Sequence, residues 1–242
     1  MKTFCMTLAQ IQKAMRAAVR PGDAEFLGMF FKTGPGQYAE GDKFIGIRMP
    51  DLRALVKKTD DLSEADLLVL VRSEIHEERS LGLLTWVRRF ERGDERVQRG
   101  IYRQYLAETA YINNWDLVDN STPSIVGAWL LEHRVERKVL CKLVQSQSLW
   151  ERRIAILATF PFIRAEEFAL TLDLAERLLA DPHDLIHKAV GWMLREVGKR
   201  EIDVLRSFLK QHADVMPRTM LRYAIEKMDL AERKRWMAQP RR

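Results

Sequence analysis

Apolar residues recur at every third or fourth position along almost the whole of this chain. Two runs with this spacing are Leu67-Leu68-Leu70-Val71 and Ile186-Val190-Met193-Val197. Such spacing places side chains on one face of an α-helix, whereas the alternating Val, Ile and Thr runs that favour strands are scarce. The pattern predicts an all-α fold of about a dozen helices joined by short polar connections.

Three segments carry the signals of helix N-termini, and one segment excludes a helix. Ser63 with Asp66 three residues later forms a capping-box pattern. Thr122-Pro123 and Asp181-Pro182 each place a cap residue before a proline, which suits the first turn of a helix. Residues 32–47 carry four glycines. This stretch therefore predicts a loop between early helices.

Related segments recur along the chain, each with a basic residue followed by small and apolar residues. They begin at Arg79, Arg153 and Lys188, so the intervals are 74 and 35 residues. A period near 35 to 37 residues fits an α-solenoid of HEAT-like repeats with a concave face; a plain globular helical array is the alternative. No segment resembles a linker, so we expect one domain over 1–242, with N-terminal helices and the glycine-rich loop in about 1–50 and the repeat core in about 50–240.

The composition excludes several classes of protein. Hydrophobic residues make up 47% and charged residues 31%, which excludes a disordered chain. The longest stretch without a charge, Asn120 to Leu131, is too short to cross a bilayer, and the first residues lack a secretion signal. Cys5 and Cys141 are too few for a disulfide framework and are expected to be buried apolar residues. We therefore expect a cytoplasmic protein that does not bind membranes.

The arrangement of the positive charge is more informative than its amount. The chain has 40 Lys and Arg against 34 Asp and Glu, a net charge of +6. On a helix expected from about Pro182 to Val197, Lys188, Trp192 and Arg195 share a stripe opposite the apolar face. An aromatic ring among cations suits a nucleic-acid surface. The alternative is a tryptophan buried under a neighbouring repeat, and Gly191 beside it indicates close approach of a backbone or a ligand.

Two further segments could carry chemistry. In NWDLVD, Trp115 and Asp119 are four residues apart, so a helix would place ring and carboxylate side by side. The N-terminus of a following helix would keep Asp119 ionised, which predicts a cation site; alternatively, Asp119 caps that helix and Trp115 is core.

Arg153 interrupts an apolar surface and requires a partner. This partner is either a carboxylate, in a buried salt bridge, or a phosphate.

Metal and nucleotide cofactors are not expected. His183 and His187 have the spacing of helical metal ligands, but the sequence supplies no third ligand. The segment Gly34-Pro35-Gly36 lacks the pattern of a phosphate-binding loop.

The motifs NWDLVD, WERRIAIL and HKAVGWMLRE, in this order and at about the repeat spacing, resemble the AlkD-type DNA alkylation repair glycosylases. The segment FFKTGPGQYAEGDKFIGIRMPDLR is similar to a branch of that family, and the resemblance spans roughly residues 20–200. It implies a HEAT-like solenoid with a concave basic groove. It also implies hydrolysis of the N-glycosidic bond of cationic N3- and N7-alkylated purines in duplex DNA.

The resemblance also implies functional residues. The family's tryptophan and aspartate correspond to Trp115 and Asp119, its groove arginine to Arg153, and its second tryptophan to Trp192, with Arg195 nearby. Phe30 stands where some members carry a tyrosine, and Asn114 where some carry a second tryptophan. The resemblance therefore implies a catalytic set of Asp119, Trp115 and Trp192 and a DNA-binding set of Arg153, Arg195, Lys188 and Phe30.

The chemistry agrees with this set. An alkylated purine is cationic and leaves readily, so one carboxylate, Asp119, could stabilise the oxocarbenium and position water. No lysine is placed as a Schiff-base nucleophile, which favours a monofunctional hydrolase. No pocket for an extruded base is evident, and the resemblance implies recognition from the backbone side. We expect a monomer without a small-molecule cofactor. The alternatives are a non-catalytic module for distorted or branched nucleic acid and a protein–protein scaffold.

Overall fold

The computed structural model describes residues 6–240, and its regular elements in that range are helices, as predicted. The extended pairing in this part of the chain is one isolated bridge between Lys43 and Ile75. The helices group into two compact units, divided between Ile125 and Val126. Cys5 lies outside the described residues, and Cys141 is half-buried.

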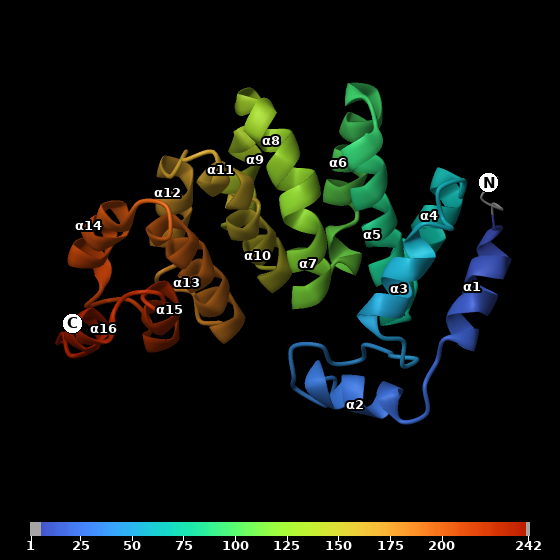
Figure 1. The fold of residues 1–242 in the computed structure, drawn as a ribbon, viewed down its shortest axis with the longest axis horizontal. Helices are drawn as coiled ribbons and strands as arrows, with labels where there is room; N and C mark the ends of the chain where they lie inside the picture. The colour runs from blue at the N-terminus through green and yellow to red at the C-terminus, as the bar shows by residue number, and fades with distance from the viewer. Residues whose placement is uncertain (1–5, 241–242) are drawn as a thin grey trace. The chain divides into compact units, whose positions relative to one another are not determined.

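The first unit contains seven α-helices and one 3₁₀ turn among the described residues, and α3, α4, α6 and α7 all lie beside α5 (Figure 1). Their bounds are α1 Leu8–Ala17, α2 Asp23–Phe30, α3 Met49–Val56, α4 Glu64–Val71, α5 His76–Arg92, α6 Glu95–Ala107, η1 Thr109–Tyr111 and α7 Trp115–Thr122.

Helix α5 is the centre of the first unit, because it packs against α3, α4, α6 and α7. Its Leu81 and Trp86 are completely buried, as are Leu67 and Leu70 of α4, the helix that packs against it. Burying large apolar side chains contributes about 1.5 to 3 kcal/mol each, so this contact is a main source of stability for the unit.

The sequence signals for the early elements are confirmed. The Ser63 side chain accepts a hydrogen bond from the Asp66 amide, and the Asp66 carboxylate accepts one from the Ser63 amide, which is the predicted capping box. Residues 32–47 form the predicted loop between α2 and α3. At Gly46 the backbone has φ 92°, and an added Cβ would lie 2.8 Å from the Ala24 amide nitrogen. A larger residue would not fit there.

The second unit contains the remaining helices of the described chain. Their bounds are α8 Ala128–Glu132, η3 Arg134–Arg137, α9 Lys138–Leu143, α10 Leu149–Leu157, α11 Phe160–Arg164, α12 Ala169–Arg177, α13 Asp184–Gly198, α14 Ile202–His212, α15 Arg218–Ala224 and α16 Leu230–Met237. Helix α13 is central, because it contacts α10, α11, α12, α14 and α15. The predicted core face of α13 is confirmed, since Ile186, Val190, Met193 and Val197 are all at 0% exposure.

Two predicted helix starts are wrong. Helix α7 does not stop before Pro123 but continues through a π-helical turn, η2 Pro123–Gly127, into α8. Proline lacks the amide needed for the regular i to i−4 bond, and the wider π turn accommodates this gap within a continuous helix. Thr122 therefore caps nothing, and its hydroxyl pairs with the Tyr105 hydroxyl at 2.7 Å.

The second wrong start concerns α13, which begins at Asp184 with His183 as its N-cap. Asp181 is not the cap because its carboxylate accepts the His183 amide at 2.8 Å and pairs with Arg152 at 2.6 Å. The turn before the helix, rather than the helix itself, contains Pro182.

The repeated sequence segments mark corresponding places in core helices. Arg79 is the fourth residue of α5, and Arg153 and Lys188 are the fifth residues of α10 and α13.

Among residues 6–240, no helix combines the length and the apolar character needed to cross a bilayer.

Candidate active site

Helix α7 carries both Trp115 and Asp119. Its N-cap is Asn114, whose side-chain oxygen accepts the Trp115 amide at 2.8 Å and whose Nδ2 donates to Asp42 Oδ2 at 3.2 Å. The four-residue spacing places Trp115 and Asp119 on one face of the helix, as predicted, and both are half-buried. The expected effect of a following helix N-terminus on Asp119 is wrong, because Asp119 lies inside the continuous α7–η2–α8 run.

Aromatic rings surround Trp115. Phe31 stacks on it with ring centroids 5.2 Å apart, and Phe30 approaches edge-on at 6.0 Å. The indole Nε1 donates to the Tyr38 hydroxyl at 3.3 Å, so the glycine-rich loop also holds the ring. Phe30 and Trp115, two predicted site residues, are therefore together, and the side chain of Phe30 is 54% exposed.

A buried ion network lies behind Trp115, and sequence reasoning missed it. His76 joins two carboxylates: its Nδ1 is 2.8 Å from Asp42 Oδ2 and its Nε2 is 2.8 Å from Asp116 Oδ2. Arg79 donates to the other oxygen of Asp42 at 2.7 Å. Burial opposes protonation of His76, but hydrogen bonds to the two carboxylates outweigh it and raise the pKa of His76 to about 9. The imidazole is thus a cation at neutral pH.

Glu77 attaches the glycine-rich loop to the start of α5. Its carboxylate accepts the amides of Ile45, Gly46 and Ile47 at 2.8 to 3.1 Å, and its side chain is almost completely buried. The loop that contains Tyr38 and Asp42 is therefore fixed at its far end. The sequence contains one indication of this role: Glu77 is an acidic residue in the first turn of a helix, where backbone amides favour a negative charge.

A cavity of about 520 Å³ opens beside Trp115, entirely within the first unit. Its aromatic walls are Phe26, Phe30, Phe31, Phe44 and Trp115. Its charged lining residues are Asp23, Arg48, His76, Glu77 and Asp116. One oxygen of this lining, the buried Oδ1 of Asp116, accepts no hydrogen bond from the described residues.

The remaining predicted site residues lie in the second unit. Arg153 is buried, with 5% exposure, and its guanidinium donates to the Leu185 carbonyl at 2.5 Å. One partner of Arg153 is therefore a backbone carbonyl in the first turn of α13, and its predicted role toward a salt bridge or a phosphate stays a prediction.

Helix α13 presents the other three residues of this group. Lys188 pairs with Asp184 at 2.8 Å, and Arg195 pairs with Glu226. Trp192 is half-buried, with the Phe160 ring 6.0 Å away. Gly191 does permit a close approach, as predicted: an added Cβ would be 2.5 Å from the Met220 carbonyl oxygen of α15.

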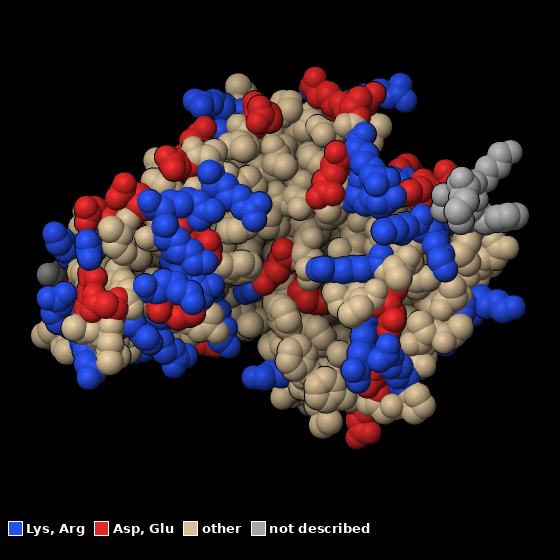
Figure 2. Space-filling view, in the orientation of Figure 1, with Lys and Arg blue, Asp and Glu red and all other residues tan. Residues whose placement is uncertain are grey.

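The surplus of positive charge lies in the second half of the chain. Residues 1–125 contain 18 basic and 18 acidic residues, whereas residues 126–242 contain 22 basic and 16 acidic residues. Figure 2 shows Lys and Arg side chains gathered on the visible face over α12–α16, with acidic side chains among them.

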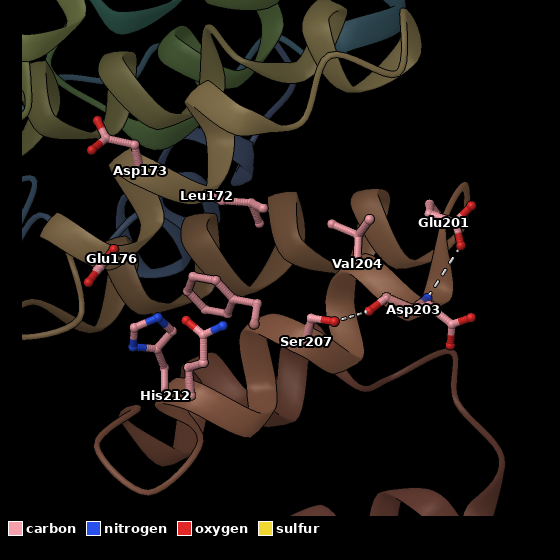
Figure 3. A pocket seen from close by; sticks show the side chains of 10 residues that line it. Leu172, Asp173, Glu176, Glu201, Asp203, Val204, Ser207 and His212 are labelled. Carbon is pink, nitrogen blue, oxygen red and sulfur yellow. Dashed lines mark hydrogen bonds between the residues drawn. The ribbon is translucent and has the colours of Figure 1, made fainter.

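A second cavity, between α12 and α14, has a different character. Asp173, Glu176, Glu201 and Asp203 lie around it, with His212 at one end (Figure 3). None of the predicted site residues lines it.

In the described part of the chain, no group of His, Cys, Asp and Glu has the geometry of a metal site. His183 and His187 form hydrogen bonds with backbone atoms.

Comparisons with known proteins agree with the fold. The family model of the DNA alkylation repair enzymes matches residues 11–228. A solved structure of a predicted DNA alkylation repair enzyme from Enterococcus faecalis is similar, with a TM-score of 0.68 and 17% identity over 88% of this chain and 97% of that one. AlkD2 from Streptococcus mutans has a TM-score of 0.53 and 16% identity over 85% and 97%. No curated protein matches the chain.

Proposed function

Because this chain belongs to the family of DNA alkylation repair enzymes, we propose that it is a monofunctional DNA glycosylase of the 3-methyladenine/7-methylguanine type. Its substrate would be duplex DNA that contains cationic N3- or N7-alkylated purines. The observation that carries the proposal is the pairing of an indole and a carboxylate, Trp115 and Asp119, on one face of α7.

The reaction needs little covalent assistance. As the bond between C1′ of the sugar and the purine nitrogen breaks, its electron pair neutralises the positive ring, and the sugar becomes an oxocarbenium. In our proposal the Asp119 carboxylate stabilises that cation and orients the water whose oxygen bonds to C1′. The water proton passes to Asp119 or to solvent. The ring face of Trp115 favours the same positive charge.

The second unit would contribute binding. We propose that Arg153, Lys188 and Arg195 hold backbone phosphates, that Trp192 packs against the damaged nucleotide, and that Phe30 contacts DNA beside Trp115. Lys188 and Arg195 already pair with carboxylates, so phosphate binding would replace those partners. The positive surplus of residues 126–242 supports this assignment.

The decisive experiment measures the release of 3-methyladenine and 7-methylguanine from methylated duplex DNA. We expect release by the wild type and a loss of about 100-fold or more in Asp119→Asn, because the variant lacks the charge that stabilises the oxocarbenium. Asp61→Asn is the matched control, since Asp61 is an exposed aspartate of the same unit and its loss should change nothing.

The result also discriminates between the alternatives. Equal release by the wild type and Asp119→Asn would remove Asp119 from the mechanism. No release by the wild type, with DNA binding intact, would indicate the non-catalytic module. No DNA binding at low salt would favour a protein–protein scaffold.

A further inference from the structure

The first residues of α7 are held by the glycine-rich loop. Asn114 Nδ2 donates to Asp42 Oδ2 at 3.2 Å, and the indole Nε1 of Trp115 donates to the Tyr38 hydroxyl at 3.3 Å. Tyr38 and Asp42 are four positions apart, so one short segment of the loop makes both contacts. The loop therefore holds the tryptophan of the proposed site as well as the helix that carries it.

Asp116, the residue after Trp115, reaches the same loop through His76. The imidazole lies between two carboxylates, with Nδ1 2.8 Å from Asp42 Oδ2 and Nε2 2.8 Å from Asp116 Oδ2. At most 8% of any of these three side chains is exposed, so water competes little for the contacts. Both sequence neighbours of Trp115 are thus connected to Asp42.

The backbone around Tyr38 is also held in place. The amide of Ala39 donates to the Lys32 carbonyl at 3.3 Å, and the amide of Asp42 donates to the Ala39 carbonyl at 3.0 Å. Ala39 is 4% exposed, whereas Tyr38 is half-buried. The Tyr38 hydroxyl is therefore presented to Trp115 by a segment that its own backbone hydrogen bonds fix.

The hydrogen bond to Tyr38 determines the orientation of the Trp115 ring more sharply than the aromatic contacts do. Phe31 stacks on the ring at 5.2 Å, and Phe30 meets it edge-on at 6.0 Å. Aromatic pairs tolerate a range of geometries, but an N–H···O bond is directional and an indole has a single donor. The orientation matters because the ring face is negative and the ring edge positive, so only the face attracts a cation.

We propose that Tyr38 is a positioning residue of the glycosylase site, whose hydroxyl holds the Trp115 ring in the orientation that favours the oxocarbenium. The inference rests on the proposed function, which supplies this cation. In this role Tyr38 does not contact the damaged nucleotide but acts through Trp115. Loss of the hydroxyl should therefore slow base release and leave the affinity for DNA unchanged.

Tyr38→Phe removes one oxygen and keeps the ring, so it tests the hydrogen bond alone. In single-turnover assays with methylated duplex DNA, we expect the release of 7-methylguanine to slow by about five- to tenfold. The Kd for the same DNA should change by less than about twofold. Tyr111→Phe is the matched control, because Tyr111 is a 39% exposed tyrosine of the same unit, and its rate should equal that of the wild type.

A double-mutant cycle shows whether Tyr38 acts through Trp115. Trp115→Phe keeps an aromatic face but has no N–H to donate, so we expect residual base release. In that background Tyr38→Phe should change the rate by less than about twofold, because the interaction that it removes is already absent. A merely structural role of Tyr38, or a direct contact with DNA, would instead give the same loss in both backgrounds.

Nuclear magnetic resonance gives a readout that needs no DNA. The indole N–H signal that disappears in Trp115→Phe belongs to Trp115. This signal should shift in Tyr38→Phe and keep its position in Tyr111→Phe, because only the first variant removes the acceptor of the indole N–H.

The outcomes separate this inference from the proposed function. Wild-type release that Tyr38→Phe leaves unchanged, an equal loss in both backgrounds, or an indole signal that stays in place would overturn the positioning role and leave the glycosylase standing. No release by the wild type would overturn the proposed function and the positioning role together.

Discussion

Single residues at the start of α7 determine how Trp115 and Asp119 are presented. Asn114 stands where some members of the family carry a second tryptophan, and in this structure it is the N-cap of α7. Its amide group caps the helix through the Trp115 N–H and ties the helix to Asp42 in the glycine-rich loop. Its complete burial means that both contacts are made without competition from water.

Asn114→Ala should therefore lower the free energy of unfolding by about 1 to 2 kcal/mol, because it removes an N-cap and leaves buried groups unpaired. Urea titration followed by circular dichroism would measure this loss. Asn113→Ala is the matched control, since Asn113 is exposed and its replacement should change stability by less than about 0.5 kcal/mol. Equal effects of the two substitutions would contradict the capping role.

His76 makes the stability of the first unit depend on pH. Its folded pKa, about 9, is above the unfolded value of 6.5, so the stability it contributes is complete below pH 6.5 and is lost as pH rises through about 9. Burial raises the pKa of Asp42, but hydrogen bonds and charges from His76 and Arg79 outweigh it, and the net effect lowers that pKa. The Asp42 contribution is thus lost only in acid.

We expect the free energy of unfolding of the wild type to decrease by up to about 3 kcal/mol between pH 6.5 and 9. His76→Gln should be less stable at pH 6.5 and should show little further decrease over this interval. Urea titrations at a series of pH values would measure both. His212→Gln, which removes a histidine of the second unit, should keep the decrease of the wild type; a wild type with constant stability would contradict the assignment.

At the scale of helices, a close approach between two backbones constrains the second unit at Gly191. Helix α13 approaches α15 at Gly191, where an added Cβ would also lie 2.5 Å from the Cβ of Tyr223. The sequence indicated a close approach at Gly191 without identifying the partner, and the structure identifies it as a neighbouring helix. Trp192, at the next position of α13, is half-buried.

Gly191→Ala should destabilise the protein by about 1 to 3 kcal/mol, because the new methyl group would force α13 and α15 apart. Gly100→Ala is the matched control, since Gly100 lies within α6 and nothing stands within 4 Å of an added Cβ there. That substitution should stabilise the protein by about 0.5 to 1 kcal/mol through helix propensity. Thermal and urea unfolding would measure both changes, and a neutral Gly191→Ala would contradict the close packing.

The chain as a whole is electrostatically uneven. Residues 1–125 have no net charge, and all six surplus positive charges lie in residues 126–242. The first unit instead contains the aromatic cavity and the carboxylate of Asp119. In the proposed function, this division assigns affinity for a polyanion mainly to the second unit and the chemistry to the first.

Binding to duplex DNA should therefore weaken with salt in proportion to the phosphates contacted. If Arg153, Lys188 and Arg195 each neutralise one phosphate, affinity should fall about 40-fold between about 50 mM and about 200 mM salt. Lys188→Gln should reduce the logarithmic salt slope by about one, whereas Lys57→Gln, an exposed lysine of the first unit, should leave it unchanged. Fluorescence anisotropy would measure these slopes, and identical slopes in all three proteins would exclude Lys188 from the interface.

The sequence by itself determined the all-α fold, the capping box at Ser63, the glycine-rich loop and the core face of α13. These features depend on neighbours within a few positions, and the 3.6-residue period and cap residues record them directly. The spacing of Trp115 and Asp119 was predictable for the same reason. The two wrong helix starts, at Pro123 and Pro182, arose because a cap residue before proline is also compatible with a π turn or with a tight turn before the helix.

Only the tertiary structure decided what surrounds those residues. His76 meets Asp42 and Asp116 across 34 and 40 positions of sequence, and the aromatic cavity joins α2, the loop and α7 in the same way. Residues that meet at such separations have no fixed spacing along the chain. A periodic pattern in a single sequence therefore cannot predict which of them meet. These contacts form because folding buries charged groups and aromatic rings. A buried charged group is stable only if it pairs with another polar group nearby.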